Sequence, residues 1–207
     1  MSLIQRLIIT TWALVSGCYG QSDVIDRRCC VPSHFRCTMD VTGGYTDPVS
    51  RTTSYVDRKV RLYNDYDLNA TRTDTDVTLP SGVTFVHSEL TFYDKHISFK
   101  VDGGQCRTDH ITDAMQDKCI PADAVLLRTS RIGPTGHDGI NVDTWRYITS
   151  DNITILRTVT SNECWPVYQT EYSVHKGGYS EMTYMISDIE LGKFPGLILT
   201  PNICIKT

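Results

Sequence analysis

The stretch Cys164-Trp165-Pro166-Val167 lies between two runs that alternate apolar and polar residues, Ile153 to Val159 and Val167 to Val174. A proline cannot donate a hydrogen bond to a sheet ladder, and a cysteine can tie a turn to a distant segment. A similar cluster, Cys29-Cys30-Val31-Pro32, occurs near the start of the chain. We therefore expect a strand boundary at residues 164–167 that a disulfide pins to another part of the protein.

The first twenty residues have the features of an export signal. Arg6 supplies a positive charge, Leu7 to Val15 is mostly apolar, and small residues follow up to Gly20. The apolar run is too short to cross a membrane. We expect residues 1–20 to be a signal peptide, cleaved before Gln21, and residues 21–207 to form a single domain of a secreted, extracellular protein.

Charge and cysteine content narrow the function classes. The formal net charge of -4 becomes -5 when the signal, with one arginine and no acidic residue, is removed. This mild acidity, without a basic stripe, argues against nucleic acid as a partner.

Of the eight cysteines, Cys18 lies in the signal, which leaves seven. An oxidising compartment predicts about three disulfides and one further thiol, with the adjacent Cys29 and Cys30 going to different partners.

From Phe35 onward the dominant hydrophobic period is two, which is typical of strands. Ile97, Phe99 and Val101 share one face of the clearest strand, and Asp102-Gly103-Gly104 provides a tight turn after it. Residues 108–117 have the spacing of one short helix. The turns recur about every 8–15 residues without long helices between them. The pattern predicts a mainly β, antiparallel, disulfide-bonded fold.

Motifs of catalysis do not occur in the sequence. It contains no nucleophile-elbow serine, no pair of histidines around a glutamate on a helix and no phosphate-binding glycine loop. The six histidines are scattered through polar and turn contexts. We therefore expect a binding protein rather than an enzyme, without a cofactor.

One stretch has the oxygen spacing of a calcium loop. Its members occupy positions 1, 3, 5, 7, 9 and 12 and are Asp65, Asp67, Asn69, Thr71, Thr73 and Asp76. Ala70 stands where the sharp turn needs glycine, and the preceding residues have the period of a strand. The sequence therefore favours an acidic surface loop over a metal site.

Two asparagines lie in glycosylation sequons. Asn69-Ala70-Thr71 is the first and Asn152-Ile153-Thr154 the second, in a turn between strands. With an export signal, both Asn69 and Asn152 are predicted to carry glycans.

The one-sided strands leave two alternatives for the interior. Two sheets packed face to face would normally fill the space between them with side chains. The same faces could stay apart and line a pocket for an apolar ligand. The hydrophobic period alone favours the filled core.

Several landmarks, in order, resemble the ependymin family of secreted glycoproteins. They span nearly all of the chain after residue 20 and are Cys30-Val31-Pro32 with Phe35, Ser54-Tyr55-Val56-Asp57 with Lys59-Val60-Arg61, Leu90 to Val101 with Cys106, Cys164-Trp165-Pro166-Val167, and Asp188-Ile189-Glu190-Leu191-Gly192 with Pro201 and Cys204.

The resemblance implies two disulfides, Cys30–Cys164 and Cys106–Cys204, with Cys29 as an alternative to Cys30. It leaves the pairing of Cys119 with Cys37 or Cys29 open. It further implies two stacked antiparallel sheets, a half-open sandwich around a hydrophobic pocket. Members of the family have been linked to lipid binding, calcium, partly through acidic glycans, contact with extracellular matrix, and homodimers.

Two functional hypotheses follow. The first is a secreted glycoprotein that binds an amphipathic lipid or fatty-acid-like ligand between the sheets. Its predicted pocket residues are Val86, Leu90, Phe92, Ile97, Phe99, Trp145, Tyr147, Ile153 and Ile155. The second is a matrix, adhesion or signalling glycoprotein that binds calcium through its glycans and has a filled interior.

Overall fold

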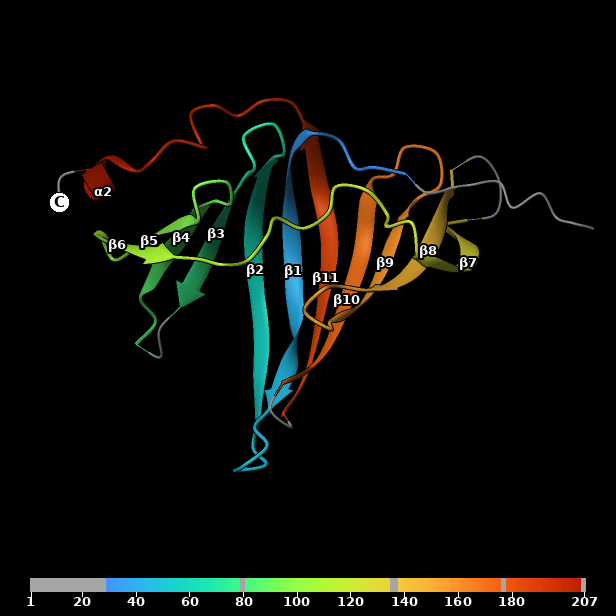
Figure 1. Cartoon of the computed structure of the whole chain (residues 1–207), viewed down its shortest axis with the longest axis horizontal. Coiled ribbons are helices and arrows are strands. Elements are labelled where there is room, and N and C mark those ends of the chain that lie inside the picture. Colours follow the sequence, from blue (N-terminus) through green and yellow to red (C-terminus); the bar gives the residue numbers. More distant parts are fainter. Residues whose placement is uncertain (1–28, 79–80, 135–137, 176–177, 206–207) are drawn as a thin grey trace, which may run out of the picture.

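The computed structural model describes residues 29–78, 81–134, 138–175 and 178–205. The predicted signal peptide lies outside these ranges. Within them the regular structure is almost all β-strand, with one short helix (Figure 1). The elements are β1 (His34–Thr46), β2 (Thr53–Asp65), β3 (Ala70–Thr78), β4 (Thr84–Phe92), β5 (Ile97–Asp102), β6 (Gln105–His110), β7 (Val125–Ile132), β8 (Ile140–Ile148), β9 (Thr154–Thr160), β10 (Pro166–His175), β11 (Gly178–Leu191) and α2 (Asn202–Ile205).

All of these strands belong to one antiparallel sheet, in the order β6-β5-β4-β3-β2-β1-β11-β10-β9-β8-β7. Two meanders, β1 to β6 and β7 to β11, meet where β1 pairs with β11. The mainly β, disulfide-bonded class is as predicted. The two stacked sheets are not, because the β1–β11 ladder joins both meanders into a single sheet. Alternation predicts strands but does not predict which strands become neighbours.

This topology forces two long connections. The end of β6 and the start of β7 lie at opposite edges of the sheet, so residues 111–124 must cross it. After β11 the chain returns from the centre toward β6, where the disulfide Cys106–Cys204 holds its end. Figure 1 shows the first connection, in yellow-green, crossing from β6 to β7, and the second, in red, passing from β11 toward α2.

The two connections cover opposite faces. Directly paired residues of neighbouring strands point to the same side of a sheet. We call the side of Phe35, Cys37 and Met39 the inner face and the side of Arg36 and Thr38 the outer face. The crossing segment 111–124, which we call the strap, lies over the inner face, and the C-terminal segment packs on the outer face.

The helix predicted over residues 108–117 is wrong. Residues up to His110 continue β6, paired with β5, and the following residues are irregular. Gly103 and Gly104 both have positive φ, of 54° and 81°, and the tight hairpin that they close extends β6. Pairing with β5 therefore overrides the weak helical spacing. The described chain has its helix at Asn202–Ile205 instead.

Candidate functional site

A cavity of about 240 Å³ lies between the inner face and the strap. Its floor is the centre of the sheet, where β2, β1 and β11 are neighbours. Met115 and Gln116 of the strap contribute the opposite wall. The crossing connection that the topology requires thus encloses a space that a bare sheet would leave open.

One wall of the cavity is apolar. Phe35, Cys37 and Met39 alternate along β1 and therefore share the inner face. Val31, Leu62, Met115 and Ile186 line the same space, and several of these residues form one hydrophobic cluster. Cys37 is the free thiol of the described chain, only 4 % exposed.

The other wall is polar and centres on Arg157. Its Nε donates to Gln169 Oε1 at 2.8 Å, and one terminal nitrogen donates to the backbone carbonyl of Asp117 at 3.3 Å. Gln169 Nε2 donates to Glu171 at 2.7 Å, and the Tyr184 hydroxyl donates to the second Glu171 oxygen at 3.0 Å. A neutral glutamine therefore stands between the cationic and the anionic side chain of this wall.

Burial changes the acidity of the cavity groups. It raises the pKa of the Cys37 thiol to about 12 and that of Tyr66 to about 12. Burial also raises the pKa of Tyr93 and of Tyr184, and the charge of Glu171 adds to the shift of Tyr184. These groups are protonated at neutral pH, and the cavity wall favours that form.

These raised pKa values predict that the folded protein loses stability in alkali. An unfolded chain releases the protons of Cys37 and Tyr66 from about pH 9 upward, whereas the folded chain retains these two to about pH 12. The unfolded state then binds fewer protons, so the free energy of unfolding falls between these values, by up to about 1.4 kcal/mol per pH unit for each group. Urea unfolding between pH 7.5 and 11.5 measures this slope.

The substitution Tyr66→Phe is the control for that slope. It keeps the ring and removes the titrating hydroxyl, so the decline above pH 10 should become shallower, while stability below pH 9 should change little. An unaltered slope would contradict the assignment of the alkaline sensitivity to the cavity wall.

Two disulfides stand beside the cavity, and they refine the predicted pairing. Cys29 bonds to Cys164 and Cys30 to Cys119, whereas the resemblance implied Cys30–Cys164 with Cys29 as the alternative. Residues 29–31 pair with the strap, since Val31 N donates to the Lys118 carbonyl and Ile120 N to that of Cys29. Adjacent strand residues point to opposite sides, so the two cysteines cannot share a partner segment. Cys106 pairs with Cys204.

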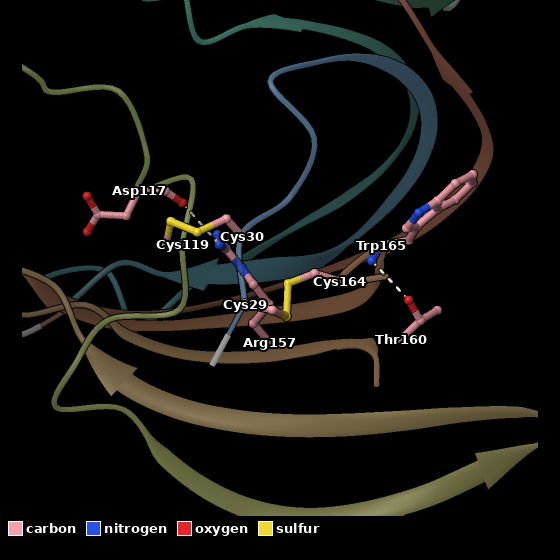
Figure 2. Close-up of a disulfide and its surroundings, with 8 residues drawn as sticks. All are labelled: Cys29, Cys30, Asp117, Cys119, Arg157, Thr160, Cys164 and Trp165. Carbon is pink, nitrogen blue, oxygen red and sulfur yellow. Dashed lines mark hydrogen bonds between the residues drawn. A yellow bond between two sulfur atoms is a disulfide. The ribbon is translucent and has the colours of Figure 1, made fainter. Parts of the chain in front are cut away.

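Figure 2 shows these two bridges next to each other, with the Arg157 side chain reaching past them to the Asp117 carbonyl. Cys164 is in the left-handed region, with φ 59°, and its turn is closed by Trp165 N, which donates to Thr160 Oγ1 at 3.0 Å. The stretch around residue 164 is therefore a pinned turn between β9 and β10, as the sequence predicted.

Five of the predicted pocket residues lie on the outer face, on the far side of the sheet from the cavity. The C-terminal segment covers part of this set, because Leu90 and Phe92 form a cluster with Ile198, and Phe99 packs against it. The five are Val86, Leu90, Phe92, Ile97 and Phe99. The period of two identifies a shared face but not which face of the sheet encloses the cavity.

The remaining four lie near β8 and β9. Trp145, Tyr147 and Ile155 are buried on the inner face, paired with residues of the neighbouring strand, but they are not among the residues that line the cavity. Ile153 is half-buried in the turn before β9. The cavity lies nearer the centre of the sheet than the prediction placed it.

The sequence prediction missed the residues that do line the cavity, Arg157 above all. A signal for it was present, because Ile155, Arg157 and Val159 share one face of β9 and both neighbours are at most 2 % exposed. A charged residue on an otherwise buried apolar face is unusual. The cavity residues of β1 and the strap carried no comparable signal.

The stretch with the oxygen spacing of a calcium loop, interpreted from the sequence as an acidic surface loop, is a β-hairpin. Asp65 ends β2, residues 66–69 turn, and β3 begins at Ala70. Thr71 and Thr73 lie on the inner face, whereas Asp76 pairs with Arg61 on the outer face, at 3.0 Å. The six oxygen-bearing side chains therefore do not converge, in agreement with the interpretation as an acidic surface loop.

A second polar group forms at the start of that hairpin. His34 Nε2 lies 2.9 Å from Asp67 and 3.4 Å from Asp65. Lys193 Nζ lies 3.5 Å from Asp67, and Asp65 accepts a hydrogen bond from Leu68 N. His34, Lys193 and a backbone amide thus already occupy these carboxylates, and we assign no metal to the group.

Both sequon asparagines lie in turns. Asn152 is exposed between β8 and β9, and Asn69 is half-buried between β2 and β3. Both have positive φ, which asparagine tolerates better than most residues. Glycosylation at Asn69 and Asn152 stays a prediction.

Two solved structures have chains that resemble this one at low sequence identity. An uncharacterized conserved protein from Thermus thermophilus has a similar structure, with a TM-score of 0.49, 10 % identity, and coverage of 82 % of this chain and 86 % of that chain. A LolA superfamily protein from Nitrosomonas europaea gives a TM-score of 0.38 and 11 % identity, with 82 % and 91 % covered. No curated protein matches the sequence. Among the described residues, no helix has the length and apolarity needed to cross a membrane.

The sequence itself matches a family. The model of the Ependymin family aligns with residues 82–204, which include the strap, the cavity residues of β9 to β11, and the cysteines at 106, 119, 164 and 204. This match covers more than half of the chain. It includes the landmarks at residues 90–106, 164–167 and 188–204 on which the resemblance was based. The chain belongs to the ependymin family.

Proposed function

We propose that this protein is a secreted carrier that binds an amphipathic lipid or a fatty-acid-like molecule in the cavity beneath the strap. The observation that carries the proposal is the division of the cavity into an apolar wall, with Phe35, Cys37 and Met39, and a polar wall with Arg157 and Glu171. An amphiphile needs both environments in one space.

The size of the cavity supports a slim ligand. Its 240 Å³ lies just below the usual range of small-molecule sites, about 300–1,000 Å³. Each methylene group transferred from water into such a site contributes about 0.8 kcal/mol. A single alkyl chain along the apolar wall would thus give useful affinity without a large pocket.

Secretion and glycosylation belong to the same proposal. Three disulfides among the described residues support an oxidising compartment. Glycans at Asn69 and Asn152 would project from turns outside the cavity lining. Calcium is not part of the proposal, because the side chains with calcium-loop spacing, from Asp65 to Asp76, do not converge.

Displacement of a fluorescent fatty acid tests the binding function. The purified protein should bind cis-parinaric acid, and Met39→Trp should weaken that binding by about tenfold, because the indole fills the cavity. Met185→Trp is the matched control, since Met185 is exposed on the outer face of β11 and its substitution should leave binding unaltered.

Extraction of the protein secreted by eukaryotic cells, followed by mass spectrometry, provides an independent readout. A lipid should be released from the wild type and be depleted in Met39→Trp. If no lipid is extracted and parinaric acid does not bind, the proposed function is wrong.

A further inference from the structure

Arg157 is a buried cation without a carboxylate partner among the described residues. Its side chain lines the cavity and the residue is only 5 % exposed. Its hydrogen bonds go to neutral acceptors, the Gln169 amide oxygen and the Asp117 carbonyl. A guanidinium carries five N–H donors, so these contacts leave most of its capacity unused.

The nearby carboxylate of Glu171 forms no ion pair with Arg157. Glu171 accepts hydrogen bonds from Gln169 and Tyr184 on its two oxygens, and none of the ion pairs within the described ranges includes Arg157. Burial of an unpaired charge is unfavourable, and natural proteins usually pair such a charge or use it for binding. An anion in the cavity would supply the missing partner.

Two buried donors lie next to the Arg157 guanidinium, on residues that are not themselves part of the cavity lining. The Arg157 guanidinium lies 5.7 Å from the centre of the Tyr147 ring, and the Tyr147 hydroxyl is buried without a hydrogen-bond partner in the part of the chain that the structure describes. Trp145 pairs directly with Arg157 across the β8–β9 ladder, and its buried indole N–H also has no hydrogen-bond partner among the described residues. Buried donors without acceptors are rare, and here they occur beside a cation.

We propose that the cavity binds an amphiphile whose head group is a carboxylate, and that Arg157 holds this carboxylate through paired N–H···O hydrogen bonds. This inference rests on the proposed lipid-binding function and specifies its ligand class. Arginine suits the role because its planar fork matches the two oxygens of a carboxylate. The alkyl chain then lies along Phe35, Cys37 and Met39, on the same face of the sheet.

Calorimetry with two ligands of equal chain length tests the head group. Dodecanoic acid should bind the wild type about tenfold or more tightly than dodecanol at pH 7.4, because the alcohol cannot accept a paired bond from the guanidinium. In Arg157→Gln this preference should disappear while dodecanol binding is retained. Arg157→Lys, which keeps the charge and loses the fork, should retain part of the preference.

Arg146→Gln is the matched control. It removes the same charge from an exposed position on the outer face of β8, and the acid-to-alcohol ratio should equal that of the wild type. A purely structural role of Arg157 would alter stability without altering this ratio.

The outcomes separate the two proposals. If neither ligand binds the wild type, the lipid-binding function itself is wrong, and the inference falls with it. If both ligands bind the wild type with equal affinity, the function stands and the role of Arg157 is overturned. If Arg157→Gln does not fold, Arg157→Lys decides the question, because a preference equal to that of the wild type would overturn the role of the Arg157 fork.

Discussion

Removal of the disulfide between Cys29 and Cys164 should destabilise the protein by about 3–5 kcal/mol, the largest effect that we expect from any single bond. The two cysteines are 135 residues apart, so the bridge removes a large amount of chain entropy from the unfolded state. Cys164 is also buried against Trp145 and Val159, and its loss leaves space in that cluster.

The variant for this measurement is the double substitution Cys29→Ala and Cys164→Ala. A single substitution would leave a free thiol next to the Cys30–Cys119 bond, where it could exchange with that bridge. Urea unfolding at pH 7 gives the free energy of unfolding of the variant and of the wild type.

The matched control removes Cys106–Cys204, which has a comparable sequence separation of 98 residues. Its entropic cost should be similar, but its bond lies on the outer face, so fatty-acid binding should be retained. In the variant without Cys29–Cys164, binding should weaken as well, because the bridge stands beside the cavity. A loss of stability below about 1 kcal/mol would contradict the expectation.

The second large effect concerns Gly43, at the joint of the two meanders. A Cβ atom placed on Gly43 would collide with the backbone carbonyl oxygen of Glu181 and lie 2.9 Å from Cα of Met182. These contacts belong to β11, the neighbour of β1, so the two central strands would have to move apart. We expect Gly43→Ala to cost about 1–3 kcal/mol, as overpacking does in a well-packed interior.

Gly196→Ala is the control for that substitution. No atom lies within 4 Å of the Cβ position at Gly196, and its φ is not in the left-handed region. The exchange reduces the freedom of the unfolded chain equally in both variants, so Gly196→Ala should be neutral or slightly stabilising. Thermal unfolding of the two variants side by side measures the difference, and equal melting temperatures would show that β1 and β11 tolerate a side chain at their joint.

Local pattern was sufficient to predict most of the strands. The alternation of Ile97, Phe99 and Val101, followed by Asp102-Gly103-Gly104, predicts the β5–β6 turn because only glycine adopts positive φ there without strain. The prediction placed a helix over residues 108–117, since nothing local showed that residues 105–110 would pair with β5. Pairing depends on partners distant in sequence, which a period of two does not identify.

The candidate site was less predictable for the same reason. Phe99 and Trp145 have equally apolar strand contexts, yet they lie on opposite faces of the sheet, and only the inner face is enclosed by the strap. The strap itself has no regular period, so its residues Met115 and Gln116 could not be assigned to the cavity. A charged residue among buried neighbours, as at Arg157, was the one local signal of the site.

The disulfides also determine which products a single proteolytic cleavage yields. The Cys29–Cys164 bridge spans residues 29–164 and the Cys106–Cys204 bridge spans residues 106–204, so the two spans overlap. Every peptide bond between residues 29 and 204 therefore lies inside at least one covalent ring. If a single peptide bond in this range is hydrolysed, a disulfide still joins the two fragments, and they separate only after reduction.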